Sequence, residues 1–442
     1  MSRQRSARGT ARAHARPASR TDLGIVEVEV SAIGARGDGL AEHAGRRLYL
    51  PLTAPGDRVR ARVGAARGDG FEAEVVETLA PAPGRAAPAC AHFGACGGCA
   101  LQHIEDAAYG AWKRDRVVEA LARAGLDGVP VDRAVRTPAG DRRRAMLAAR
   151  KAGGRVLLGF NERRSHRIVD VAACPVLLPA LADCLAPLRR LLGTLLDDGQ
   201  ALDVAATLLD DGLDLVLTGP LDLDLAARER LAAFAEDADL ARLSWRPRAG
   251  APAEPLVHRR EGVVRFAGVS VVLPPGGFLQ ASRSGEAALQ RLVLAGVGGA
   301  GRVADLFAGC GTFAIPLALG TATVHAVEGD MAASAALTGA STRLPRLSVE
   351  RRDLDRDPIP AKALGRFDAV VFDPPRAGAA AQATEMAGSG VPVVVGVSCN
   401  PATFARDART LVDGGYVLER VTPVDQFLWS PHVELVGVFR RN

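Results

Sequence analysis

GRVADLFAGCGTF, from Gly301 to Phe313, is the stretch of this 442-residue chain that points most clearly to a fold. A short apolar run ends at Phe307, and a glycine-rich turn then leads into a segment of helical composition. Similar apolar runs recur at helix-length intervals: ATVHAVE (322–328), DAVVFDPP (368–375), PVVVGVSCN (392–400) and VELVGVF (433–439). Because buried parallel strands read as continuous apolar runs, residues 266–442 are predicted to form a doubly wound α/β sheet.

Composition sets the outer limits for the rest of the chain. A hydrophobic content of 48% and a charged content of 24% are ordinary globular values, which excludes a fibrous or largely disordered protein. No apolar run reaches the roughly 18 residues that span a bilayer, so no membrane partner is expected and a cytoplasmic location is predicted. Residues 1–20 carry six arginines and no acidic residue, and they are predicted to form a disordered basic tail.

Two further regions precede the predicted sheet. Residues 21–82 alternate apolar and polar positions between Gly, Pro and Asp breaks, which predicts a small β-barrel of a kind that commonly binds oligonucleotides. Residues 90–265 combine helical and strand-like segments, and they are predicted to form a central α+β domain. Its dense arginines, among them Arg142 and Arg144, indicate either an RNA-binding surface or charged strand edges, and the residues alone favour neither.

The turn within Asp305–Phe313 has the character of a cofactor-binding loop. Gly309 and Gly311 allow close approach of a ligand, and Glu328 follows Asp305 by 23 positions, which suits a carboxylate that accepts ribose hydroxyls. The dinucleotide pattern G-x-G-x-x-G is not met, because no third glycine follows Gly311 on schedule. Together with DPPR at 373–376, the loop fits S-adenosylmethionine better than NAD. Cys310, inside this loop, is expected to pack as a small apolar side chain and to take no part in the chemistry.

Three closely spaced cysteines predict a metal site. Cys90, Cys96 and Cys99 stand with five and then two residues between them in the glycine-rich segment CAHFGACGGC, and Cys174 is the natural candidate for a fourth ligand. Four thiolates can hold either an iron–sulfur cluster or a zinc ion, and their spacing leaves both open. Cys184 lies in a helical pattern and is expected in the core.

A lone cysteine, Cys399, stands at the end of an apolar strand in VVGVSCNPATFARDAR (394–409). Pro401 and the residues after it predict a helix, so the sulfur lies beside a helix N-terminus, where a thiolate is favoured. A buried cysteine acting as a small apolar residue is the alternative.

Several short motifs, in order along the chain, resemble the bacterial RNA 5-methyluridine methyltransferases, specifically the iron–sulfur type that acts on large-subunit ribosomal RNA. They are FLQAS (278–282), DLFAGCGTF, DPPRAG, SCNPATFARD and HVE (432–434), together with the four cysteines. The resemblance implies a Rossmann-like methyltransferase domain, a TRAM-like barrel over 21–82 and a 4Fe-4S cluster held by Cys90, Cys96, Cys99 and Cys174. Where the family often has asparagine, this chain has Ser282 and Thr312.

The resemblance also implies roles for individual residues. Cys399 matches the nucleophile that adds to carbon 6 of uracil, and Glu434 matches the general base that removes the proton from carbon 5. The positions that match contacts to S-adenosylmethionine are Gln280, Phe307, Glu328, Asp353 and Asp373.

The leading hypothesis is therefore methylation of carbon 5 of a uridine in structured RNA, most specifically 23S rRNA, by a monomer. Three alternatives stay open: a tRNA uridine-5 methyltransferase, an enzyme that methylates an exocyclic base amine, and a noncatalytic RNA-binding protein. The amine-methylating reading is weakened by Arg376, which stands where its motif usually ends in an aromatic residue.

Overall fold

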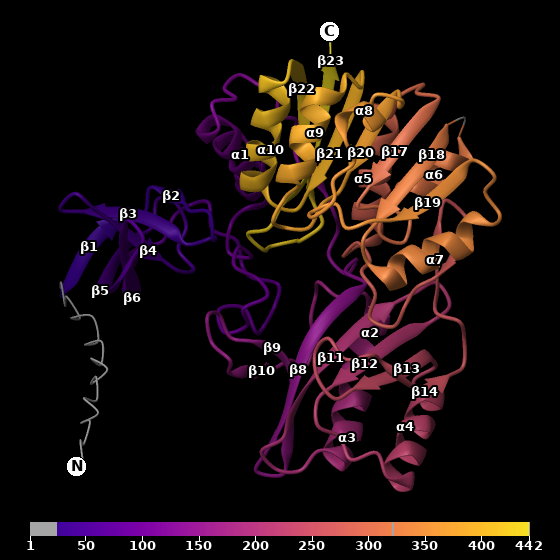
Figure 1. Ribbon diagram of the computed structural model, residues 1–442. Helices are drawn as coiled ribbons and strands as arrows, with labels where there is room; N and C mark the ends of the chain where they lie inside the picture. Colours follow the sequence, from indigo (N-terminus) through magenta and orange to yellow (C-terminus); the bar gives the residue numbers. More distant parts are fainter. Residues whose placement is uncertain (1–23, 321, 442) are drawn as a thin grey trace, which may run out of the picture. The chain divides into compact units, whose positions relative to one another are not determined.

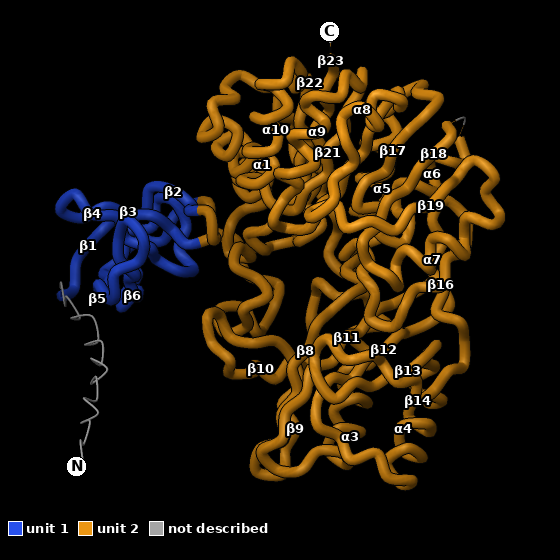
Figure 2. Tube along the Cα trace, in the orientation of Figure 1, with its two compact units in different colours: residues 1–34, 38–83 blue, residues 35–37, 84–442 orange. Residues whose placement is uncertain are grey.

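The computed structural model describes residues 24–320 and 322–441, so the predicted basic tail over 1–20 lies outside the described residues. Two compact units account for them (Figure 2). The first comprises residues 24–34 and 38–83, and the second comprises residues 35–37 and 84–441. None of the described helices combines the length and the apolar character that crossing a bilayer requires.

The described residues of the first unit form a six-stranded sheet in the order β1-β5-β6-β4-β3-β2. In β1, only Val26 and Val28 are buried, which is the period-2 burial expected of a strand with one face on a core. β1 also lies against β3, and the buried side chains of the sheet share one hydrophobic cluster. The strands are β1 (Ile25–Glu29), β2 (Ala32–Ile33), β3 (Gly39–His43), β4 (Arg46–Leu50), β5 (Arg58–Arg67) and β6 (Gly70–Ala80).

The C-terminal part of the second unit is the predicted doubly wound sheet, which the structure confirms (Figure 1). Its described strands follow the order β19-β18-β17-β20-β21-β23-β22-β7, parallel from β19 to β21, with β23 antiparallel to β21. The strands are β7 (Val135–Arg136), β17 (Arg302–Leu306), β18 (Thr323–Glu328), β19 (Leu347–Arg351), β20 (Ala369–Phe372), β21 (Val393–Ser398), β22 (Tyr416–Asp425) and β23 (Glu434–Arg441).

Helices cover both faces of this sheet. In β17, Val303 belongs to one hydrophobic core and Ala304 to another, because consecutive strand residues point to opposite faces. The first core contains side chains of α5 (Arg283–Val297), α6 (Ala314–Leu319) and α7 (Met331–Ser341). The second contains side chains of α1 (Asp106–Arg123), α8 (Ala361–Leu364), α9 (Ala380–Ser389) and α10 (Pro401–Asp413).

The middle of the chain differs from the predicted boundaries of 90–265 in two places. Helix α1 packs in the second core, and β7 pairs with β22, so residues 106–136 extend the C-terminal sheet. The hairpin of β15 (Val263–Phe266) and β16 (Val269–Val272) crosses the predicted boundary at 265 and packs in the first core. An apolar pattern reveals which face of an element is buried but does not identify the sheet that it covers.

A second sheet occupies what remains of the middle region. Its described strands follow the order β10-β9-β8-β11-β12-β13-β14, and the apolar side chains of one face share a core with the helices between them. The elements are β8 (Arg144–Ala152), β9 (Arg155–Asn161), β10 (Ile168–Asp170), α2 (Pro179–Asp183), α3 (Leu185–Leu195), β11 (Ala201–Leu208), β12 (Leu213–Thr218), α4 (Leu225–Asp237), β13 (Leu240–Arg246) and β14 (Glu254–His258).

Candidate active site

Cys399 stands between β21, whose residues are all buried, and α10, which begins at Pro401. Asn400 caps the helix by accepting a 3.2 Å hydrogen bond from the backbone N–H of Ala402. Its side-chain nitrogen donates to the carbonyl oxygen of Arg376 at 3.1 Å, which fixes the neighbouring loop to the start of the helix. The predicted position of the cysteine at a strand-to-helix junction is confirmed.

The expectation that the helix N-terminus favours a thiolate at Cys399 was wrong, because the pKa of this thiol is raised. Burial raises the pKa of this thiol to about 11, the carboxyls of Glu434 and Asp373 raise it further, and Arg376 offsets only part of the increase. The helix N-terminus is therefore outweighed by burial and by two acidic groups from other strands. In this state the thiol is protonated near neutral pH, and it must lose its proton when it reacts.

Glu434 is the first residue of β23, and it is only 3% exposed. Burial raises the pKa of its carboxyl to about 8, with a further contribution from Asp373. A hydrogen bond from Gln426 Nε2 to Glu434 Oε2, at 2.7 Å, acts in the opposite direction. A carboxyl with a pKa near the working pH is well suited to accept and release a proton.

Gln426 belongs to a buried chain of side chains that sequence reasoning missed. Its Nε2 also donates to Gln280 Oε1 at 2.8 Å, and Gln280 Nε2 donates to Asp373 Oδ2 at 3.3 Å. The Gln426 carbonyl accepts the backbone N–H of Ala281 at 3.1 Å, so both ends of its amide are engaged. The chain Glu434–Gln426–Gln280–Asp373 therefore joins three predicted site residues through one that no sequence motif marks.

The turn after β17 has the geometry of a ligand-binding loop. Phe307 has a left-handed backbone (φ +60°), which non-glycine residues adopt at an energetic cost and which is typical of functional sites. Glu328, at the end of β18, accepts the backbone N–H of Gly309 at 2.7 Å and that of Asp330 at 2.6 Å. The predicted pairing of the glycine turn with the acidic residue of the next strand is thus present.

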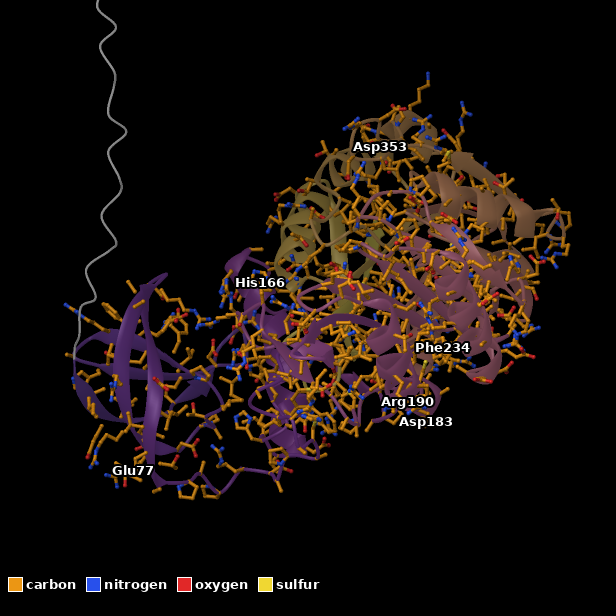
Figure 3. All side chains as sticks on the ribbon, turned by 90° about the horizontal axis from the view of Figure 1, so that it is seen from below. Glu77, His166, Asp183, Arg190, Phe234 and Asp353 are labelled. Carbon is orange, nitrogen blue, oxygen red and sulfur yellow. The ribbon has the colours of Figure 1, made fainter. Side chains whose placement is uncertain are left out.

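Two further carboxyls lie near this turn in different settings. Asp305 is fully buried, and neither of its oxygens has a hydrogen-bond partner of normal geometry among the described residues. Burial, and then the neighbouring Asp373, raise the pKa of Asp305 well above its usual value. Asp353 is instead exposed (Figure 3), and its carboxylate caps a local turn by accepting the N–H of Asp355 at 3.2 Å. The backbone N–H of the preceding residue, Arg352, donates to the backbone carbonyl oxygen of Glu328 at 3.0 Å.

The four predicted ligand cysteines line one cavity of about 460 Å³, and Cys399 lines the same cavity. Burial raises the pKa of the thiols of Cys96 and Cys174, and that of Cys99 to about 12; nearby thiols of the same set add to each increase. Within residues 24–320 and 322–441, no three His, Cys, Asp or Glu side chains are already grouped as a metal site. Cys184 and Cys310 lie in hydrophobic cores, as predicted.

The same cavity is also lined by basic and aromatic groups. The guanidinium of Arg142 lies 5.9 Å from the centre of the Phe427 ring, and its Nε donates to the carbonyl oxygen of Arg144 at 2.9 Å. Arg376 and His432 complete this part of the wall. Cationic groups beside an aromatic face suit a planar ligand that carries negative charge, such as a nucleotide.

Comparison with known proteins adds a family and a set of relatives. Residues 353–442 match the model of the tRNA (Uracil-5-)-methyltransferase family. An uncharacterized RNA methyltransferase from Caulobacter vibrioides is 47% identical, over 94% of this chain and 100% of its own length. The 23S rRNA (uracil(1939)-C(5))-methyltransferase RlmD from Halomonas elongata is 37% identical, over 92% of this chain and 88% of its own.

A solved structure has the same fold. It is that of a tRNA (uracil-54, C5)-methyltransferase from Pyrococcus abyssi in complex with S-adenosyl-L-homocysteine. The TM-score is 0.71 at 23% sequence identity, and the match covers 94% of this chain and 100% of that one.

Proposed function

Because the chain belongs to the RNA uracil-5 methyltransferase family, we propose that it methylates carbon 5 of a uridine in 23S rRNA through a covalent adduct with Cys399. One relationship carries this proposal. Strands β21 and β23 pair Ser398 with Leu435, so the next step of the antiparallel register brings Cys399 beside Glu434. Cys399 lines the cavity, and the buried carboxyl of Glu434, whose pKa suits a general base, lies beside it.

The adduct is needed because carbon 5 of uracil is too electron-poor to attack a methyl group by itself. Addition of the Cys399 sulfur to carbon 6 forms a C–S bond and moves an electron pair toward carbon 5, which then forms a bond to the methyl carbon. Glu434 takes the proton from carbon 5, and the electrons left behind expel the sulfur as the C–S bond breaks. S-adenosylmethionine, when bound, would supply the electrophilic methyl group, with its methyl–sulfur bond breaking to leave S-adenosyl-L-homocysteine.

The residues around the glycine turn fit that methyl donor. Glu328 keeps the capacity to accept ribose hydroxyls, since a carboxylate has lone pairs beyond those used by two backbone N–H groups. Asp305 and Asp373 supply carboxyls for the cationic methionine end, and Asp305 has no competing partner of normal geometry in the described residues. Asp353, with its carboxylate engaged in a local turn, supports cofactor binding less than the other predicted positions.

For the cysteine set we propose a 4Fe-4S cluster that holds the surrounding loops together. The support is that four thiols line one cavity, and that burial and then neighbouring thiols raise the pKa of Cys96, Cys99 and Cys174, a penalty on the thiolates that binding to cationic iron would relieve. Zinc bound by four thiolates is the competing assignment. Protein purified without oxygen is expected to contain iron and sulfide in equal amounts. A colourless preparation with one zinc per chain would overturn the assignment.

The choice of RNA rests on the relatives. The Halomonas enzyme supports 23S rRNA, whereas the family description and the Pyrococcus structure favour tRNA as a second candidate. We propose that the first unit is a TRAM-like barrel that contacts the RNA. Its described residues include more aspartates and glutamates than arginines, so such contact depends on local groups and not on net charge.

The test combines the protein, labelled S-adenosylmethionine, and rRNA or tRNA that lacks native modifications. Wild-type protein is expected to form 5-methyluridine, and the Cys399→Ala variant to form none while still binding RNA. Sequencing of methylated positions in cells with and without the protein then separates rRNA from tRNA. RNA binding without turnover by the wild type would support the noncatalytic alternative and overturn the proposal.

A further inference from the structure

The loop from Gln426 to Val433 connects β22 to β23 and leads directly into Glu434. It supplies Gln426 to the buried side-chain network, and it supplies Phe427 and His432 to the cavity wall. Trp429, near its centre, has a left-handed backbone (φ +57°), which costs free energy and requires support from neighbouring groups. The position of the general base thus depends on what holds this loop.

A buried lysine from a distant part of the sequence holds it. Lys113, on α1, is 0% exposed, and its Nζ lies 2.8 Å from Asp425 Oδ1, at the residue where β22 ends. The same ammonium donates to the carbonyl oxygen of His432 and, at 3.4 Å, to that of Phe427. One cation therefore contacts the start and the end of the loop simultaneously.

Tyr109, one helical turn before Lys113, supports the middle of the loop. Its hydroxyl donates to Asp425 Oδ2 at 2.7 Å and accepts the backbone N–H of Trp429 at 2.8 Å. The carbonyl oxygen of Trp429 accepts the N–H groups of Ala100 at 2.8 Å and Leu101 at 3.1 Å. The strained residue is thus held on both sides of its backbone.

We propose that Lys113 is a positioning residue for Glu434, and that Tyr109 assists it; this inference rests on the proposed function. A buried ion pair is weak evidence of a role in stability, because well-packed apolar residues of similar size often serve a core equally well. Lys113 differs from a simple ion-pair partner because it also binds two loop carbonyls. Removing these bonds frees the loop end that lies two residues before Glu434, while Cys399, which follows β21, is untouched.

The test separates formation of the RNA adduct from its resolution. Lys113→Met alone leaves the buried Asp425 with only the longer ionic contact to Arg136, whose Nε lies 3.5 Å from Asp425 Oδ2, so the informative variant is Lys113→Met combined with Asp425→Leu. We expect this double variant to retain the wild-type melting temperature and form the Cys399 adduct at the wild-type rate. Its adduct should resolve about 10- to 100-fold more slowly, the penalty typical of a misplaced catalytic group. Tyr109→Phe, which removes a single hydroxyl, should slow resolution in the same direction by a smaller factor.

Two outcomes overturn the inference. Resolution at the wild-type rate in a folded double variant would mean that Lys113 serves folding alone. If the double variant does not fold, the Tyr109→Phe variant is the test of the positioning role. Equal effects of this change on the rates of adduct formation and adduct resolution would reject that role. Failure of the wild-type protein to form any adduct through Cys399 is a different result, because it rejects the proposed function itself. Iron content, measured in every variant, guards against an indirect effect through the neighbouring cysteine loop.

Discussion

Gln426 donates a 2.7 Å hydrogen bond from Nε2 to the buried carboxyl of Glu434. The same amide nitrogen donates to Gln280, and its carbonyl accepts the N–H of Ala281, so the amide cannot rotate without losing a buried bond. The hydrogen bond favours the charged form of Glu434 and opposes the rise in pKa that burial causes. Gln426 therefore adjusts how readily the carboxyl accepts a proton.

Replacing Gln426 by leucine should raise the pKa of Glu434 above about 8. The loss of a hydrogen bond to a charged group corresponds to roughly one to two pH units. A general base acts only when deprotonated, so the acidic limb of the pH–rate profile should move to higher pH, and activity should recover as the pH rises. Gln200→Leu, at a half-buried glutamine bonded to Asp197 in the central region, is the control that should leave the profile unchanged. An acidic limb that moves to lower pH would contradict the assignment.

The Cys399 thiol of the free protein should react slowly with iodoacetamide at neutral pH. With a pKa of about 11, only about one molecule in ten thousand carries a thiolate at pH 7, and the rate should rise about tenfold per pH unit. Arg376→Met removes a group that lowers this pKa and should slow the reaction, whereas Asp373→Asn removes one that raises it and should accelerate the reaction. Arg376→Lys should restore the wild-type rate. Mass spectrometry of the Cys399 peptide provides the measurement, and a faster reaction in Arg376→Met would refute the electrostatic explanation.

The two glycines of the cofactor turn should tolerate alanine differently. A Cβ on Gly311 would come within 2.6 Å of Leu337 and 2.8 Å of Ile315, at a backbone φ of +101°. Gly309→Ala has a similar backbone penalty (φ +56°), but nothing in the described residues lies within 4 Å of its Cβ. We expect Gly309→Ala to reduce the free energy of unfolding by about 1 kcal/mol and Gly311→Ala by about 2 to 4 kcal/mol. Urea unfolding followed by circular dichroism compares them, and equal losses would mean that packing around Gly311 relaxes freely.

Cys174 and Cys184 form a matched pair for the metal assignment. Cys174 lines the cavity with the three other predicted ligands, whereas Cys184 lies in the hydrophobic core of the central sheet. Cys174→Ala should lose most of the bound iron and the visible absorption of a cluster, and Cys184→Ala should retain both. Iron analysis under anaerobic conditions makes the comparison. Full iron content in Cys174→Ala would remove this residue from the ligand set.

Much of the site could be predicted because its residues lie where buried strands end. Glu328, Asp373 and Cys399 each follow a continuous apolar run, and parallel strands bring such ends to one edge of a sheet. The role of Gln426 could not be predicted, since its partners Gln280 and Glu434 become neighbours only through strand pairing and loop packing.

The pKa of Cys399 escaped prediction for a related reason. A helix N-terminus is visible in the local sequence, whereas the acidic groups that oppose it come from β23 and from the end of β20. Helix α1 likewise packs against the C-terminal sheet through apolar side chains, and its local sequence does not indicate which sheet they cover.

The attachment of α1 and β7 to that sheet limits how the molecule can be dissected. A fragment that starts at residue 266 contains every glycine-turn residue and both proposed reacting groups, yet it lacks Val117 and Leu121, which cover part of the second core. It also lacks the partner strand of β22, leaving an open sheet edge. A recombinant fragment that begins there would expose apolar surface and tend to precipitate. The segment from Asp106 to Arg136 must be present with it, either in the same chain or as a separate peptide.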